Sequence, residues 1–77
     1  MDVRIGIADS SQIIELELEN DVDRDALKAE VDAVVTGKSE SLWLTDRKGK
    51  EFAVPATRIA FVEIGTADAE RRIGFGA

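Results

Sequence analysis

Residues 14–35, IELELENDVDRDALKAEVDAVV, decide the fold, because the spacing of apolar side chains changes within them. Ile14, Leu16 and Leu18 alternate with glutamates, and this period of two predicts a half-buried β-strand. The strand would carry a row of carboxylates on its outer side. Beyond Asn20 the apolar residues adopt a helical spacing instead, so the stretch predicts a strand followed by a helix.

The helix is predicted over residues 24–36. Asp23 is the expected N-cap, since its carboxylate can accept hydrogen bonds from the free amides of the first turn. Gly37 is the expected C-terminal stop, where a left-handed backbone favours a residue without Cβ. The apolar side chains fall at i, i+4, i+7 and i+8, which places them on one face: Leu27, Val31, Val34 and Val35.

Strand patterns flank this segment on both sides. Alternating or continuous apolar runs predict strands at residues 3–7, 41–45, 52–54 and 59–64, in addition to 14–18. The order strand, strand, helix, strand, strand, strand predicts an α+β fold of two layers, with one helix on a five-stranded sheet. It has the order of the β-grasp arrangement of ubiquitin-like proteins. Another α+β sandwich with strands paired in sequence order is the alternative.

A chain of 77 residues allows one domain, which we place at residues 1–65, followed by a flexible tail at 66–77. The helix should pack on the inner side chains of the strands. The expected core contacts join Leu27, Val31 and Val34 to Val3, Ile5, Leu16, Leu44 and Val62.

Composition excludes several classes of function. The sequence has no cysteine and no histidine, which removes thiolate chemistry and the usual general base. Residues 1–40 hold eleven acidic and four basic side chains, and this acidic half argues against nucleic-acid binding. The first residues lack a signal-peptide pattern and no apolar run approaches a membrane span. We therefore expect a cytoplasmic protein that binds neither nucleic acid nor membrane.

The acidic residues do not form a persuasive catalytic or metal site. Glu15, Glu17 and Glu19 fall on the solvated face of a strand, whereas acid–base catalysis needs carboxylates in contrasting environments. The run of aspartates at 21–25 is similar to half of a calcium loop, but Ala26 stands where the loop needs glycine. We expect no enzymatic activity, no cofactor and no metal.

The candidate site is an apolar patch on the sheet face opposite the helix. Side chains alternate between the two faces of a strand, and Val62 and Ile64 are expected to face the helix. The large side chains at the alternate positions therefore point outward. Such a patch usually marks an interface. Its members are Ile13, Trp43, Ile59 and Phe61, and the tail adds Arg71, Arg72, Ile73 and Phe75 as candidate interaction residues.

The sequence does not decide what buries this patch. A second copy in a homodimer or another protein could bind to it. Alternatively, the tail could fold back over it, or strand twist could scatter its residues so that no patch forms. The alternative function is a small-molecule carrier, nucleotides included, that uses Arg58, Arg71 and Arg72.

Four blocks of the sequence carry a resemblance to a known family. They are Val-Arg-Ile-Gly-Ile at 3–7, Leu-Trp-Leu-Thr-Asp at 42–46, Arg-Ile-Ala-Phe-Val-Glu-Ile-Gly at 58–65 and Arg-Arg-Ile-Gly-Phe-Gly at 71–76. Together they are similar to a family of short actinobacterial proteins of unknown function. The resemblance implies a cytoplasmic protein of an actinobacterium. It implies no activity, cofactor or binding residue.

Overall fold

The computed structural model of the chain describes residues 1–66. In chain order its elements are β1 (Asp2–Ile7), β2 (Ile13–Glu17), α1 (Arg24–Val35), β3 (Ser41–Thr45), β4 (Glu51–Pro55), the short 3-10 helix η1 (Ala56–Arg58) and β5 (Ile59–Ile64). One helix with several strands confirms the predicted α+β class. Of the predicted tail, residues 67–77 lie outside the described part of the chain.

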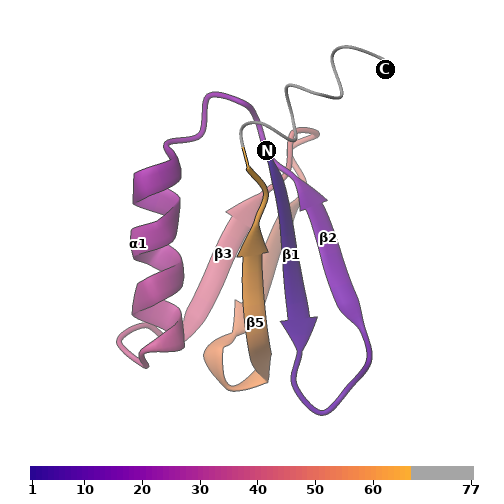
Figure 1. The fold of residues 1–77 in the computed structure, drawn as a ribbon, viewed down its shortest axis with the longest axis vertical. Helices are drawn as coiled ribbons and strands as arrows, with labels where there is room; N and C mark the ends of the chain where they lie inside the picture. Colours follow the sequence, from indigo (N-terminus) through magenta and orange to yellow (C-terminus); the bar gives the residue numbers. More distant parts are fainter. Residues whose placement is uncertain (67–77) are drawn as a thin grey trace.

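The predicted single sheet of five strands is wrong. Figure 1 shows a three-stranded sheet in the order β2–β1–β5, with the β3–β4 hairpin crossing behind it and α1 alongside β3. β1 pairs with β2 on one side and with β5 on the other, so it has no free edge for the hairpin. Both pairings of β1 are antiparallel, whereas the β-grasp arrangement needs its first and last strands to run parallel. The β-grasp expectation is therefore also wrong.

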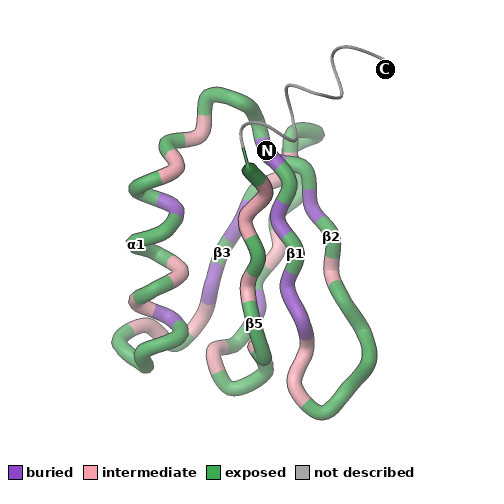
Figure 2. Tube along the Cα trace, viewed as in Figure 1, coloured by how far each residue is buried: buried purple, intermediate pink, exposed green. Residues whose placement is uncertain are grey.

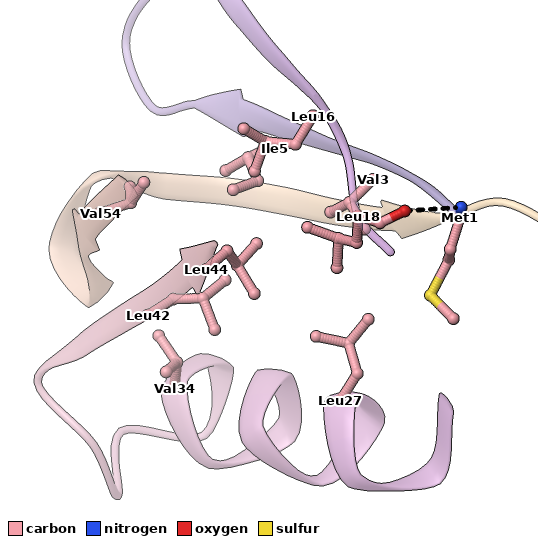
Figure 3. Packing of buried hydrophobic residues seen from close by; sticks show 10 residues of the cluster. All are labelled: Met1, Val3, Ile5, Leu16, Leu18, Leu27, Val34, Leu42, Leu44 and Val54. Carbon is pink, nitrogen blue, oxygen red and sulfur yellow. Dashed lines mark hydrogen bonds between the residues drawn. The ribbon is translucent and has the colours of Figure 1, made fainter. Parts of the chain in front are cut away.

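The core lies between the two sheets and the helix. Figure 3 shows its members pointing toward one another: Met1, Val3, Ile5, Leu16, Leu18, Leu27, Val34, Leu42, Leu44 and Val54. Val3 and Ile5 are completely buried, as the alternation of β1 predicts. The hairpin contributes Leu42, Leu44 and Val54, so it forms one side of the hydrophobic core.

Met1 is a core residue that the sequence did not suggest. Its side chain is only 6% exposed. Its amino group donates a hydrogen bond to the carbonyl of Leu18 at 3.1 Å, and the amide of Leu18 returns one to the carbonyl of Met1 at 2.8 Å. These two bonds extend the β1–β2 ladder by one pair beyond the assigned strands.

The helix begins at the predicted residue and ends one residue before the predicted end, because Thr36 is its C-cap. The carboxylate of Asp23 accepts hydrogen bonds from the amides of Asp25 at 2.9 Å and Ala26 at 3.2 Å, which confirms the N-cap. α1 ends at Val35, and Gly37 follows with a φ of +84°. The local capping chemistry therefore fixes both ends of the helix.

The apolar stripe of the helix is narrower than predicted. Leu27 and Val34 are buried and Val31 is half-buried, but Val35 is 55% exposed. Adjacent helical residues are separated by about 100° around the axis, so Val35 lies past the edge of the stripe that Val34 occupies. Figure 2 shows the helix with buried positions on one side only.

Candidate functional site

The predicted apolar patch is divided between three places in the structure. Ile13 and Phe61 lie on the outer face of the three-stranded sheet, and Trp43 lies on the outer face of the β3–β4 hairpin. Ile59 instead packs against the core, so its predicted outward position is wrong. One continuous patch does not form, because the strands that would carry it belong to two sheets.

An irregularity in β5 explains the position of Ile59. Gly6 pairs with Phe61, yet the next residue of β1, Ile7, pairs with Ile59, so Ala60 has no partner. Such a bulge adds one residue to the strand and shifts the facing of its side chains by one. Ile59 and Val62 therefore both turn toward the core, although their spacing in a regular strand would place them on opposite faces.

The outer face of the three-stranded sheet carries an apolar row across all three strands. Gly6 pairs with Ile13 on one side and with Phe61 on the other. The ring of Phe61 lies over Gly6, since a Cβ built on this glycine would be 2.1 Å from the ring. Ile13 is 40% exposed and Phe61 is 45% exposed. We call Ile13, Gly6 and Phe61 the Phe61 row.

Charged side chains form the next row along the same face. Arg4 is placed between Glu15 and Glu63 by its two pairings, and it bonds to Glu63 at 3.1 Å. Asp2 and Glu17 follow one step further on, with Glu17 exposed as predicted. The Phe61 row is thus bordered on this side by four carboxylates and two guanidinium groups, because Arg47 bonds to Glu17 at 3.0 Å.

Trp43 borders a different surface. Its side chain is 63% exposed and lies opposite Ala53 on the side of the hairpin that faces away from the core. A groove of about 320 Å³ runs beside it between α1 and β3. We call this the Trp43 groove; its lining includes Ala29, Glu30, Ala33, Ser39, Ser41 and Trp43.

The remaining candidate residues are not assembled by the described part of the chain. Arg58 is exposed on η1, where its carbonyl accepts a hydrogen bond from the amide of Ala8 at 2.7 Å. Arg71, Arg72, Ile73 and Phe75 lie outside residues 1–66. A ligand site shared by the three arginines therefore stays a prediction.

The described surfaces offer apolar contact area bordered by carboxylates. Within residues 1–66, no group of three acidic side chains lies close enough together to hold a metal ion. In the same part of the chain, no helix has the length and apolar character needed to cross a membrane.

Sequence reasoning missed Gly6 as the support of Phe61. A glycine inside an alternating strand often marks a close approach of another group, so Gly6 carried a usable signal. Sequence reasoning also missed Arg24, whose guanidinium donates to the carbonyls of Ile64 and Gly65. That contact joins the start of α1 to the end of β5, and no local pattern indicates it.

The fold and surfaces define a small α+β protein in which one helix and a β-hairpin back a three-stranded antiparallel sheet. The chain belongs to the DUF3107 family, described as proteins of unknown function, whose model matches residues 1–76. This confirms the predicted membership of a family without an assigned role. The actinobacterial origin and the closing motif as a family feature stay predictions. Among curated proteins, none matches the chain significantly.

Proposed function

We propose that this protein is a non-enzymatic, cytoplasmic interaction module that binds another protein through the outer face of its three-stranded sheet. The observation that supports the proposal is the Phe61 row. Phe61 is nearly half exposed on β5, next to the bulge at Ala60, with Ile13 beside it across Gly6. Exposed aromatic side chains of this kind often dominate the binding energy of an interface.

The Phe61 ring is held in place before any partner arrives. Its contact with Gly6 brings the ring against the backbone of the sheet, where a Cβ would displace it. A side chain that is already ordered loses little conformational entropy on binding, so more of its contact energy contributes to affinity. Gly6 is a positioning residue in this proposal, and Phe61 is the contact residue.

Charge favours a different protein over a second copy as the partner. Asp2, Glu15, Glu17 and Glu63 border the row, against two guanidinium groups, that of Arg4 between the flanking glutamates and that of Arg47, which bonds to Glu17 at 3.0 Å. Two copies meeting through this face would bring carboxylates together, which is unfavourable. A partner with an apolar centre and a lysine- or arginine-rich border fits better.

The interface should be weak and reversible. Complete burial of a large apolar side chain contributes roughly 1.5–3 kcal/mol, and Ile13 and Phe61 are already more than half buried. Each therefore has about half of that contribution left to offer. Basic groups on the partner would supply additional attraction that decreases as salt increases.

Affinity capture from the native host with two matched variants tests the proposal. Phe61→Ser removes the contact residue, which is 45% exposed, while Val35→Ser removes a 55% exposed apolar side chain from the end of α1. We expect a captured protein that is retained by wild type and Val35→Ser, lost with Phe61→Ser and weakened by salt. Thermal unfolding of both variants verifies that they are folded.

Sedimentation of the purified chain separates the two kinds of partner. We expect wild type to remain monomeric across the concentration range. A dimer that dissociates on Phe61→Ser would show that the partner is a second copy. A monomer combined with no captured protein that depends on Phe61 would refute the proposed function.

A further inference from the structure

The edge of β3 that faces away from β4 has open hydrogen-bonding groups. The amide of Ala56 donates to the carbonyl of Glu40 at 2.8 Å, which makes these two residues a hydrogen-bonded pair of the hairpin. Antiparallel pairs alternate, so the backbone groups of Ser41, Trp43 and Thr45 point away from β4. No backbone hydrogen bond joins them to another strand within residues 1–66.

The other strand edges in the described part of the chain carry protection against pairing. β4 has Pro55, which lacks an amide hydrogen, and β5 has the bulge at Ala60. On β2, Glu15 and Glu17 bring charge to the edge, and the carbonyl of Glu17 accepts from the amide of Arg47 at 2.8 Å. Charges, prolines and bulges are the usual devices that prevent strand addition.

β3 has none of these devices. Its sequence, Ser-Leu-Trp-Leu-Thr, contains no charge, no proline and no glycine, and its ladder with β4 is regular. A strand of this composition with an open edge is suited to accept one more strand. The Trp43 groove lies along it, and Ala29 and Ala33 on the facing side of α1 are small enough to leave room.

The chain leaves the described part of the structure at the helix that forms this groove. Arg24, the first residue of α1, donates hydrogen bonds to the carbonyl of Ile64 at 3.4 Å and to the carbonyl of Gly65. The chain therefore reaches Thr66 close to the first turn of α1. Ala33 lies nine residues further along this helix, which is about 14 Å at 1.5 Å per residue.

The remaining segment is long enough to reach the groove and to pair with β3. Residues 67–77 follow Thr66, and eleven extended residues span up to about 36 Å. Reaching Ala33 uses less than half of that length. β3 runs toward the end of the molecule where the chain leaves, because its following turn bonds to β2 beside β1 and Gly65 (Figure 1). A segment that returns along β3 would be antiparallel to it.

The composition of this segment complements the groove. Ile73 and Phe75 alternate with Arg72 and Gly74, the period of a strand with one apolar side. Glu30 is the one charged residue among those that line the groove, and it is exposed. Arg71 and Arg72, next to Ile73, supply the opposite charge, whereas the two acidic residues of the segment, Asp68 and Glu70, precede them.

We propose that residues 67–77 dock in the Trp43 groove of their own chain as an additional antiparallel strand on β3. Docking buries Trp43 under Ile73 and Phe75 and places the adjacent arginines near Glu30. This inference is independent of the proposed partner surface, which lies on the outer face of the other sheet. The docked segment is an internal ligand that a competing extended peptide would displace.

Fluorescence of the full chain tests this docking, because Trp43 is the single tryptophan. In wild type we expect blue-shifted emission and weak quenching by acrylamide. The double variant Ile73→Ser/Phe75→Ser should show solvent-like emission and quenching several-fold stronger. Ala69→Ser, which leaves the apolar pair and the arginines intact, is the matched control and should behave as wild type.

A charge reversal provides a second test that leaves the apolar contacts in place. Glu30→Arg should increase quenching of Trp43, and combining it with Arg71→Glu and Arg72→Glu should restore protection. Quenching that is equal in wild type and the Ile73→Ser/Phe75→Ser variant would overturn the proposal. Protection that increases with protein concentration would also overturn it, since the segment would then dock on another copy. Phe61→Ser should leave Trp43 unaffected, which separates this test from that of the proposed function.

Discussion

The two outer faces of this protein each present an aromatic side chain, but in opposite settings. Phe61 lies on a three-stranded sheet, where it covers Gly6 and has an ion-paired row beside it. Trp43 lies on a two-stranded hairpin opposite Ala53, is more exposed, and borders a groove and an open strand edge. The comparison shows that the role of an exposed aromatic residue depends on what surrounds it. The ring of Phe61 packs on Gly6, whereas no residue within 1–66 covers the exposed side chain of Trp43.

The largest expected effect tests whether the hairpin is as integral to the fold as the three-stranded sheet. Ile5 and Leu42 are both almost completely buried, one from each sheet. Ile5→Ala and Leu42→Ala should each lower the free energy of unfolding by roughly 2–5 kcal/mol in urea titrations. Val35→Ala, at an exposed site, should change it by less than about 0.5 kcal/mol. A much smaller loss for Leu42→Ala would make the hairpin an appendage to a core held by the other sheet.

The next effect tests the support of Phe61 by Gly6. Gly6→Ala should destabilise the protein by about 1–3 kcal/mol, because the added Cβ displaces the ring from the sheet. In a Phe61→Ala background the same change should be neutral or stabilising, since alanine suits a strand better than glycine. The double-mutant cycle should therefore give a coupling of about 0.5–3 kcal/mol. Additive effects would mean that the ring does not rest on Gly6.

The two hairpin turns allow a matched test of backbone strain. Asp9 in the β1–β2 turn has a φ of +58°, and Gly49 in the β3–β4 turn has a φ of +87°. Gly49→Ala should cost about 1 kcal/mol, because a Cβ disfavours this region. Asp9→Gly should lower the stability far less, or raise it slightly, because two effects oppose each other. Glycine relieves the strain of the positive φ in the folded state, but it also adds conformational freedom to the unfolded chain. Thermal unfolding of the two variants would compare them; equal losses would contradict the strain argument.

The smallest effect concerns the charges beside the Phe61 row. The Arg4–Glu63 pair is exposed, so Glu63→Gln should change the free energy of unfolding by no more than about 1 kcal/mol, and less at high salt. Replacing Glu15, Glu17 and Glu19 by glutamine together should leave the fold intact. Melting curves with added calcium or magnesium complete the test. A metal-dependent increase in the melting temperature of wild type, absent from the triple variant, would reveal a site that our reasoning dismissed.

The sequence predicted those features of the structure that depend on residues close together in the chain. The helix was predicted because Asp23, the apolar stripe and Gly37 all act within a few residues of one another. The carboxylate row on β2 followed from alternation alone. The candidate interaction residues were less predictable, since their grouping required strand pairings that the pattern does not encode.

The sequence by itself determined the α+β class, the helix with its caps, and the inward facing of residues such as Val3, Ile5 and Leu16. Only the tertiary structure decided that the strands divide into two sheets, that a bulge at Ala60 turns Ile59 inward, and that Phe61 rests on Gly6. Periodicity and capping depend on neighbours within one turn or one strand. Sheet membership and register depend on hydrogen bonds between segments as far apart as β1 and β5, and those are settled when the whole core packs.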